Sequence, residues 1–231
     1  MVKPHLKRLN APRTWPISRK GTKWVTRQNP GPHKLHESIP LNILLKDLLK
    51  YAKTKRDVKR ILNNKEVLIN KIPRRDVKFP VGIFDIIEIP KTKEHFLLLL
   101  NKKGKLCLSK IDEKKAEIKH LKIINKKILK KGRLQINFYN GNNIITDYKD
   151  YKVGDTLLMN LKERKIVKHL KLEKGASVYL TKGKHTGLIG TFEKIIPSSD
   201  NSKNNIVELK MDNKTTRTLK DYIFVVDKSL I

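Results

Sequence analysis

The chain has 231 residues, of which 53 are lysine or arginine and 22 are aspartate or glutamate, so its formal net charge is +31. A body with this charge repels itself until counter-charge arrives, which indicates a polyanionic partner. A membrane surface is disfavoured, because the longest apolar run, residues 96–100, is far shorter than the roughly 20 residues that cross a bilayer. Basic residues along the whole length favour nucleic acid over an acidic protein.

The length allows two or three small domains, and 38% apolar and 6% aromatic residues allow only modest cores. The single cysteine, Cys107, stands between two leucines, so we expect it in a buried strand and expect no disulfide. Residues 1–10 carry charge but no apolar stretch follows them, so no signal peptide is predicted. We therefore expect a reducing cytoplasm.

The first 40 residues are basic and irregular. Nine lysines and arginines and five prolines precede the first acidic residue, Glu37. Such a sequence buries too little apolar surface to offset chain entropy, so we predict a disordered arm that orders against a polyanion. Trp15 and Trp24 are candidates for stacking on bases, with docking onto the protein's own body as the alternative.

Two helices are predicted after Pro40. Leucines at helical spacing predict the first over residues 41–51, and Thr54 with Asp57 forms a capping box before the second, residues 55–64.

The second helix carries a basic stripe of two like-charge pairs, Lys55 with Lys59 and Arg56 with Arg60. Each such pair destabilises a helix by roughly 0.2–0.5 kcal/mol, so the stripe favours an external anion over an inert solvated face.

The periodicity then changes from 3.6 to 2. Residues 67–69 and 80–90 are predicted as strands, joined through a basic turn at 70–75, with Gly82 as a bulge or turn residue. Two helices followed by strands make one small α+β unit.

The rest of the chain is predicted to be mainly β. Residues 112–118 are predicted as its one helix, followed by a lysine-rich stretch through residue 131. Asn140-Gly141 favours a hairpin turn, and the last strands are expected to close a small barrel. The predicted strands are residues 96–100, 105–108, 134–139, 144–147, 156–161, 165–169, 176–180, 188–192, 206–211 and 221–226.

No catalytic or metal-binding pattern is present. Gly183-Lys184 resembles part of a phosphate loop, but that loop needs a glycine where this chain has Tyr179 and a serine or threonine where it has His185. The histidines and Cys107 lack metal-ligand spacing. We therefore predict no enzyme, no metal and no cofactor.

Several segments resemble a known family. HLKRLNAPRTWPISRK near the start, FPVGIFDIIEIP, GASVYLTKGKHTGLIGTFEKI and TTRTLKDYIFVVD follow the order found in the archaeal and eukaryotic small-subunit ribosomal proteins of the S4e family. The short tail resembles the archaeal type. The resemblance covers almost the whole chain, so it is more specific than any one motif.

The resemblance implies an α+β, mostly β, multidomain protein. Its parts would be a basic arm (1–40), an S4-type RNA-binding module (41–90), a central β-rich domain (91–171) and an SH3-like barrel with a KOW motif (172–231). It implies a structural constituent of the cytoplasmic small ribosomal subunit that binds small-subunit rRNA and neighbouring ribosomal proteins. No membrane, small-molecule substrate or homo-oligomer is expected.

The basic segments and the resemblance together select the predicted RNA-binding residues. They are Lys3, His5, Lys7, Arg8, Arg13, Trp15, Arg19, Lys20, Lys23, Trp24, Arg27, Lys34, Lys55, Arg56, Lys59, Arg60, Lys71, Arg74, Arg75, Lys182, Lys184 and His185.

Two other functions remain open at this point. An RNA-modifying enzyme could carry the same RNA-binding module, although the β-rich remainder offers no nucleophile, and a free KOW-containing factor would not explain the basic arm.

Overall fold

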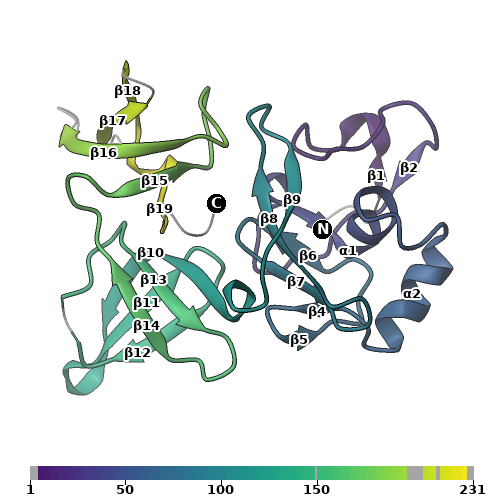
Figure 1. Cartoon of the computed structure of the whole chain (residues 1–231), viewed down its shortest axis with the longest axis horizontal. Helices are drawn as coiled ribbons and strands as arrows, with labels where there is room; N and C mark the ends of the chain where they lie inside the picture. Colours follow the sequence, from purple (N-terminus) through teal and green to yellow (C-terminus); the bar gives the residue numbers. More distant parts are fainter. Residues whose placement is uncertain (1–4, 149, 197–204, 212–213, 228–231) are drawn as a thin grey trace. The chain divides into compact units, whose positions relative to one another are not determined.

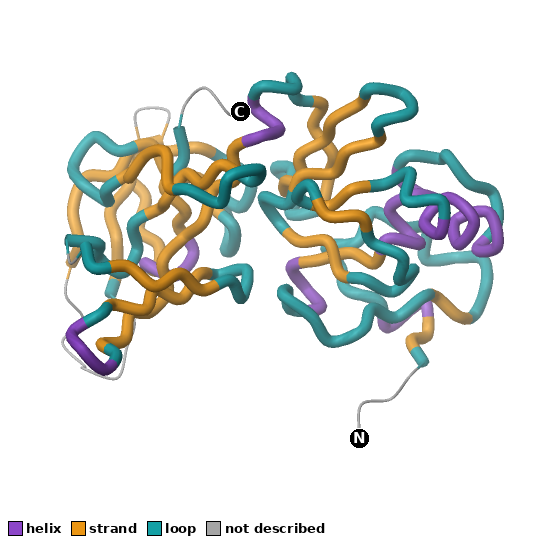
Figure 2. The backbone as a smooth tube through the Cα atoms, turned by 90° about the horizontal axis from the view of Figure 1, so that it is seen from below, coloured by secondary structure: helices purple, strands orange, loops and turns teal. Residues whose placement is uncertain are grey.

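The computed structural model describes residues 5–148, 150–196, 205–211 and 214–227. They form two compact units, the first from residues 1–100 and 105–119 and the second from residues 101–104 and 120–231. The α-helices belong to the first unit, and the second consists of strands, loops and short 3-10 turns (Figures 1 and 2). The predicted α+β, mostly β class is confirmed.

The N-terminal segment is packed, so the prediction of a disordered arm is wrong for residues 5–40. Strand β1 (Leu6–Lys7) pairs with β2 (Trp24–Val25), and 3-10 turns lie at Arg8–Asn10 and Leu35–Glu37. The Leu106 N–H donates to the Thr14 carbonyl at 2.8 Å, which ties the segment to a later strand. Prolines and isolated apolar residues fix a single irregular path here without helical or strand periodicity.

The two predicted helices are present. Helix α1 (Leu41–Ile43) continues into a π-helical turn (Leu44–Leu48), so it ends earlier than the leucine pattern predicts. Helix α2 (Lys55–Asn63) begins with the predicted capping box, in which the Asp57 N–H donates to the Thr54 hydroxyl at 3.2 Å. The Thr54 N–H in turn donates to the Asp57 carboxylate at 2.9 Å.

The sheet of the first unit has the order β5-β4-β7-β8-β9. Because β7 pairs with β8, the domain boundary predicted between residues 90 and 91 divides one continuous sheet. A separate pair joins β3 (Ser38–Pro40) to β6 (Pro80–Gly82). The bounds of the five strands are β4 (Leu68–Ile69), β5 (Ile72–Pro73), β7 (Ile86–Ile89), β8 (Glu94–Leu100) and β9 (Leu106–Lys110). Cys107 lies in β9 and is half-buried, and its burial raises the pKa of the thiol.

Gly82 is needed for close packing rather than for a bulge. A Cβ atom added there would lie 2.2 Å from the His33 ring, which no real side chain tolerates. The glycine therefore lets the N-terminal segment approach β6 directly.

The helix predicted over residues 112–118 is wrong. Only a 3-10 turn, Lys115–Glu117, forms there, and the following lysine-rich stretch is the long strand β10 (Ile118–Ile128). Lys119 and Lys122 are buried in this strand. Their partners, described below, come from distant parts of the chain.

The second unit contains two five-stranded sheets. The first has the order β12-β11-β10-β13-β14, and its core includes Leu121, Ile123 and Leu157. Gly141, with φ of 76°, lies in the predicted turn between β11 and β12. The strands that accompany β10 are β11 (Leu134–Phe138), β12 (Asn143–Thr146), β13 (Thr156–Asn160) and β14 (Ile166–Leu170).

The second sheet has the order β18-β17-β16-β15-β19 around a core that includes Val178, Val207 and Leu209. Strand β18 was not among the predicted strands, and its sequence, Lys-Thr-Thr-Arg-Thr-Leu, contains only one apolar residue. The strands are β15 (Ser177–Leu180), β16 (Ile189–Ile196), β17 (Ile206–Met211), β18 (Lys214–Leu219) and β19 (Ile223–Val225).

Candidate nucleic-acid interface

A buried ionic cluster around Asp85 positions the N-terminal segment. Asp85 is 1% exposed and accepts hydrogen bonds from His33 Nε2 at 2.9 Å, from the Gly82 N–H at 2.8 Å and from Asn70 Nδ2 at 2.9 Å. The Lys119 ammonium also contacts its carboxylate. Burial by itself would raise the pKa of Asp85, but Lys119 and His33 outweigh it and hold that pKa far below its usual range.

Two arginines of the N-terminal segment donate hydrogen bonds to its backbone and shape it. Arg19 donates through Nη1 to the Ala11 carbonyl at 2.8 Å and to the Leu9 carbonyl at 3.2 Å. Arg8 donates to the Ser18 carbonyl at 2.9 Å and through Nε to the Thr22 carbonyl at 3.0 Å. These guanidinium donors satisfy backbone carbonyls of an irregular loop, so both arginines build the structure.

Trp15 is also structural. It is 1% exposed, and its indole N–H donates to the Ser38 carbonyl at 2.7 Å. The prediction that Trp15 stacks on a base is therefore wrong, because neither face of the ring is accessible. The alternative, docking onto the protein's own body, is the role that the structure gives it.

Trp24 is placed differently. It is 51% exposed, the His5 ring lies 5.6 Å away between centroids, and Lys23 Nζ lies 5.5 Å from the indole centroid. A flat ring with two basic neighbours is the arrangement on which an RNA base can stack.

The other predicted residues of this segment differ in accessibility. Lys3 lies outside the described residues. The exposed ones are Lys7, Arg13, Lys20 and Lys34, and Arg27 is half-buried.

Helix α2 presents four cations on its outer face. Its inner face buries Val58 and Leu62 completely, and Figure 1 shows the helix at the periphery of the first unit. The outer cations are exposed, and within the described residues none makes a hydrogen bond or an ion pair. They are Lys55, Arg56, Lys59 and Arg60. Their charge is thus available to an external anion.

The positive charge of the turn after β4 is partly compensated by neighbouring side chains. Lys71 donates to the Glu88 carboxylate at 2.9 Å, and the Arg74 guanidinium lies 4.5 Å from the Phe79 ring centroid. Arg75 is exposed. Of the three predicted residues in this turn, Arg75 is the most accessible.

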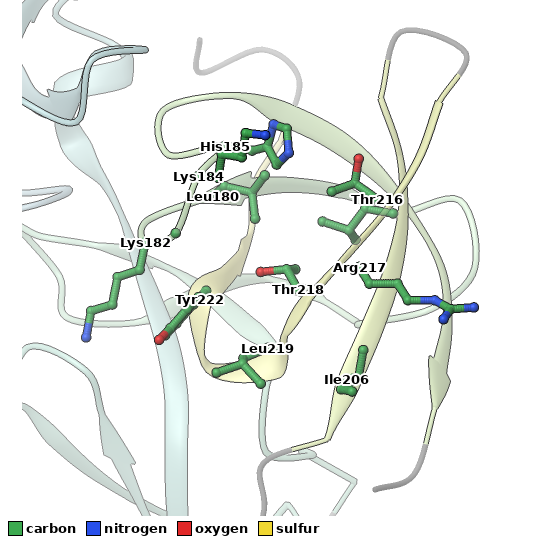
Figure 3. A pocket seen from close by; sticks show the side chains of 12 residues that line it. Leu180, Lys182, Lys184, His185, Ile206, Thr216, Arg217, Thr218, Leu219 and Tyr222 are labelled. Carbon is green, nitrogen blue, oxygen red and sulfur yellow. The ribbon is translucent and has the colours of Figure 1, made fainter.

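Lys182, Lys184 and His185 come together at a pocket of the second unit. Its volume is about 420 Å³, and Figure 3 shows its lining side chains, including Tyr222 and Thr218. The predicted residues therefore fall into an N-terminal group, the α2 stripe, the turn at 70–75 and this pocket.

Sequence reasoning missed two sets of residues. The first is the cluster of His33, Asp85 and Lys119, for which a lone carboxylate in the apolar run at 80–90 was a usable signal, since a buried charge needs a partner. The second is the contribution of Thr216, Thr218 and Tyr222 to the pocket, which depends on the unpredicted strand β18.

Among the described residues, no group of three or more histidine, cysteine, aspartate or glutamate side chains could hold a metal ion. No helix in that part of the chain is long and apolar enough to cross a membrane. The fold and surfaces thus define a basic, mostly β protein with exposed cationic faces.

Comparison with known proteins gives the family. The model named Ribosomal family S4e matches residues 92–166, and the RS4NT (NUC023) domain matches residues 2–36. The small ribosomal subunit protein eS4 of Methanosphaera stadtmanae is 44% identical over 98% of this chain and 94% of its own length. That of Archaeoglobus fulgidus is 40% identical over 99% of this chain and 95% of its own.

A solved structure of the same family is similar to this chain. The crystal structure of the 30S ribosomal protein S4e from Thermoplasma acidophilum has a TM-score of 0.72 and 32% identity, and covers 84% of this chain and 96% of that one. The chain belongs to the S4e family of ribosomal proteins, as its sequence motifs suggested.

Proposed function

We propose that this chain is a structural constituent of the small ribosomal subunit, where it binds and stabilises folded small-subunit rRNA. The relatives at 40–44% identity carry the name of a small ribosomal subunit protein. The observation that carries the RNA-binding part is the exposed cationic face of α2, on a chain of net charge +31. Its setting is the cytoplasm.

RNA would be held by two kinds of contact. Arg56 and Arg60 present guanidinium forks that can grip phosphate oxygens bidentately, and Trp24 offers a ring for stacking. The N-terminal loop is already folded by Arg8, Arg19 and the Asp85 cluster, so little further ordering entropy opposes binding there.

The parts of the chain would divide this work. Residues 41–90 would act as the S4-type RNA-binding module, residues 91–171 as the central domain, and residues 172–231 as the SH3-like barrel with a KOW motif. Neighbouring ribosomal proteins would be the further partners, and neither a catalytic activity nor a small-molecule substrate is part of this proposal.

Salt titration tests the RNA contact. If six to ten phosphates are neutralised, affinity of the purified chain for small-subunit rRNA should fall by roughly 10³–10⁵ between 50 and 200 mM salt, with the duplex-DNA relation as guide. A nearly flat titration would refute the polyanion contact.

Sedimentation of native lysate tests the ribosomal part. A ribosomal constituent travels with the small subunit, whereas a modifying enzyme or a free factor remains largely in the light fractions. Recovery of the chain mainly in those fractions would overturn the proposal.

A further inference from the structure

The pocket of the second unit has an apolar floor. Leu180 and Leu209 are 1% and 0% exposed, and Ile206 and Leu219 extend the floor beside them. The volume of about 420 Å³ lies within the range of roughly 300–1,000 Å³ that is usual for small-molecule sites. A nucleobase with its ribose fits a space of this size.

The walls of the pocket are held in place by hydrogen bonds. The Thr181 N–H and hydroxyl both donate to the Tyr222 carbonyl, at 2.8 and 2.9 Å, and the Thr186 hydroxyl donates to the Gly183 carbonyl at 2.6 Å. Behind Tyr222, the buried Lys122 ammonium donates to the Ile223 carbonyl at 2.7 Å. A preformed pocket loses little entropy when a ligand enters.

Gly183 supplies the positive φ with which one wall turns beside Tyr222. Its φ is +89°, and a Cβ atom built there would lie 3.5 Å from the Tyr222 ring. The loop 182–185 therefore turns sharply beside the aromatic ring, and Lys182 Nζ lies 5.9 Å from the centroid of that ring.

Among the described residues, the lining is basic and includes no carboxylate. Twelve residues line the pocket, and its cations are Lys182, Lys184 and Arg217, with His185 beside them (Figure 3). Arg217 is compensated by Glu208, whose carboxylate accepts from Nε at 2.9 Å. Lys182 and Lys184 add positive charge at the rim. The Thr216 and Thr218 hydroxyls can donate or accept hydrogen bonds.

We propose that this pocket binds one unstacked nucleotide of RNA. The base lies on the apolar floor beside the Tyr222 ring, the threonine hydroxyls meet its polar edge, and Lys182 and Lys184 hold the phosphate. An aromatic ring beside a cationic rim is the combination by which proteins hold single-stranded RNA. This inference rests on the proposed rRNA binding, since it assigns one contact within it.

A pair of variants on one strand tests the base contact. Thr218 and Thr215 both lie in β18, but Thr218 lines the pocket whereas Thr215 is exposed. The probes are the full chain with the RNA hexamer rA6 and with the same hexamer carrying abasic ribose at every position. Amide chemical shifts of residues 180–185 and 216–222 report where each probe binds.

The parent and Thr215→Trp should bind rA6 at least tenfold more tightly than the abasic hexamer, as measured by the shifts of these amides. Thr218→Trp fills the pocket and should lose that difference. Equal shifts with both hexamers in the parent, or equal rA6 binding by both variants, would overturn the proposal. So would hexaglutamate producing the same shifts as rA6, because the pocket would then be a site for acidic protein.

Variants of the lysines at the pocket rim test the same site without the bulky Thr218→Trp substitution. The double variant Lys182→Gln/Lys184→Gln should weaken rA6 binding at these amides at least tenfold. Lys210→Gln/Lys214→Gln removes the same charge from exposed positions and should change it less than twofold. Equal loss in both doubles would mean a diffuse charge effect and would overturn the pocket site.

The two proposals fail separately. If Thr218→Trp behaves like Thr215→Trp while the parent binds rRNA with a steep salt dependence, only the pocket is refuted. If the parent does not bind rRNA, the proposed function itself is refuted.

Discussion

The N-terminal segment and helix α2 are both strongly basic, yet they use their charge in opposite ways. In the N-terminal segment, the Arg8 and Arg19 guanidiniums donate to backbone carbonyls and hold an irregular loop together. In α2, the outer cations have no hydrogen-bond or ion-pair partner among the described residues. Counting basic residues therefore overstates the charge that a protein offers to RNA, because some cations build the fold.

The same contrast holds for the tryptophans and the lysines. Trp15 is buried and bonded to Ser38, whereas Trp24 is half exposed. Lys119 and Lys122 are buried against a carboxylate and against carbonyls, whereas Lys55 is exposed. Each pair allows a test of which basic or aromatic residues support the fold and which face a ligand.

The largest effect is expected at the Asp85 cluster. Asp85→Asn leaves the Lys119 charge buried without its counter-charge, which should lower the free energy of unfolding by about 3–5 kcal/mol. Glu66→Gln, which breaks the exposed pair with Lys91, is the control and should change little. Urea unfolding measures both. Equal stability of the two variants would show that the cluster does not anchor the N-terminal segment.

The tryptophans give the next test. Trp15→Ala should destabilise the chain by about 3–5 kcal/mol, because it empties a fully buried site. Trp24→Ala should leave stability within about 0.5 kcal/mol of the parent, since the ring is half exposed, and should weaken rRNA binding. Thermal unfolding and filter binding separate the two outcomes. A Trp15→Ala variant as stable as the parent would support the original prediction of a disordered arm.

The pH dependence of stability tests whether Lys122 is one of the buried basic residues. Burial lowers the pKa of Lys122 to about 8, so between pH 8 and the ordinary lysine pKa the unfolded chain binds more protons than the folded one. The stability of the parent should therefore rise with pH across this window by about 3 kcal/mol more than that of Lys122→Met.

Urea unfolding at pH 7, 8, 9 and 10 measures that difference. The free energies of unfolding of the two proteins should change in parallel below pH 8, where Lys122 is charged in both the folded and unfolded states of the parent. Parallel curves up to pH 10 would show that the Lys122 ammonium is not buried.

The smallest effect on stability is expected in α2. Arg56→Gln/Arg60→Gln should fold normally or slightly better, by about 0.2–0.5 kcal/mol, because it removes one like-charge pair. It should weaken rRNA binding and reduce the salt slope by up to about one unit for each lost phosphate contact.

Lys102→Gln/Lys103→Gln is the matched control, because it removes two charges from exposed positions in the β8–β9 hairpin. Its salt slope should remain closer to that of the parent. Identical slopes for the parent and the α2 variant would mean that the stripe is an inert solvated face.

The sequence by itself determined the features that depend on near neighbours. The Thr54–Asp57 capping box, the turn at Gly141 and the β8–β9 hairpin each use residues within a short stretch, so local chemistry predicts them. The family was also readable, because its motifs occur in order along the chain.

Only the tertiary structure decided which basic and aromatic side chains remain accessible. Arg19, Trp15 and Lys122 look like surface or RNA-binding residues in sequence, but each donates a hydrogen bond to a backbone carbonyl that is not its near neighbour in the chain. Lys122 reaches Ile223, a residue about a hundred positions away. The physical reason is that a buried donor is stable only when a partner from elsewhere in the fold satisfies it, and no local pattern encodes that partner.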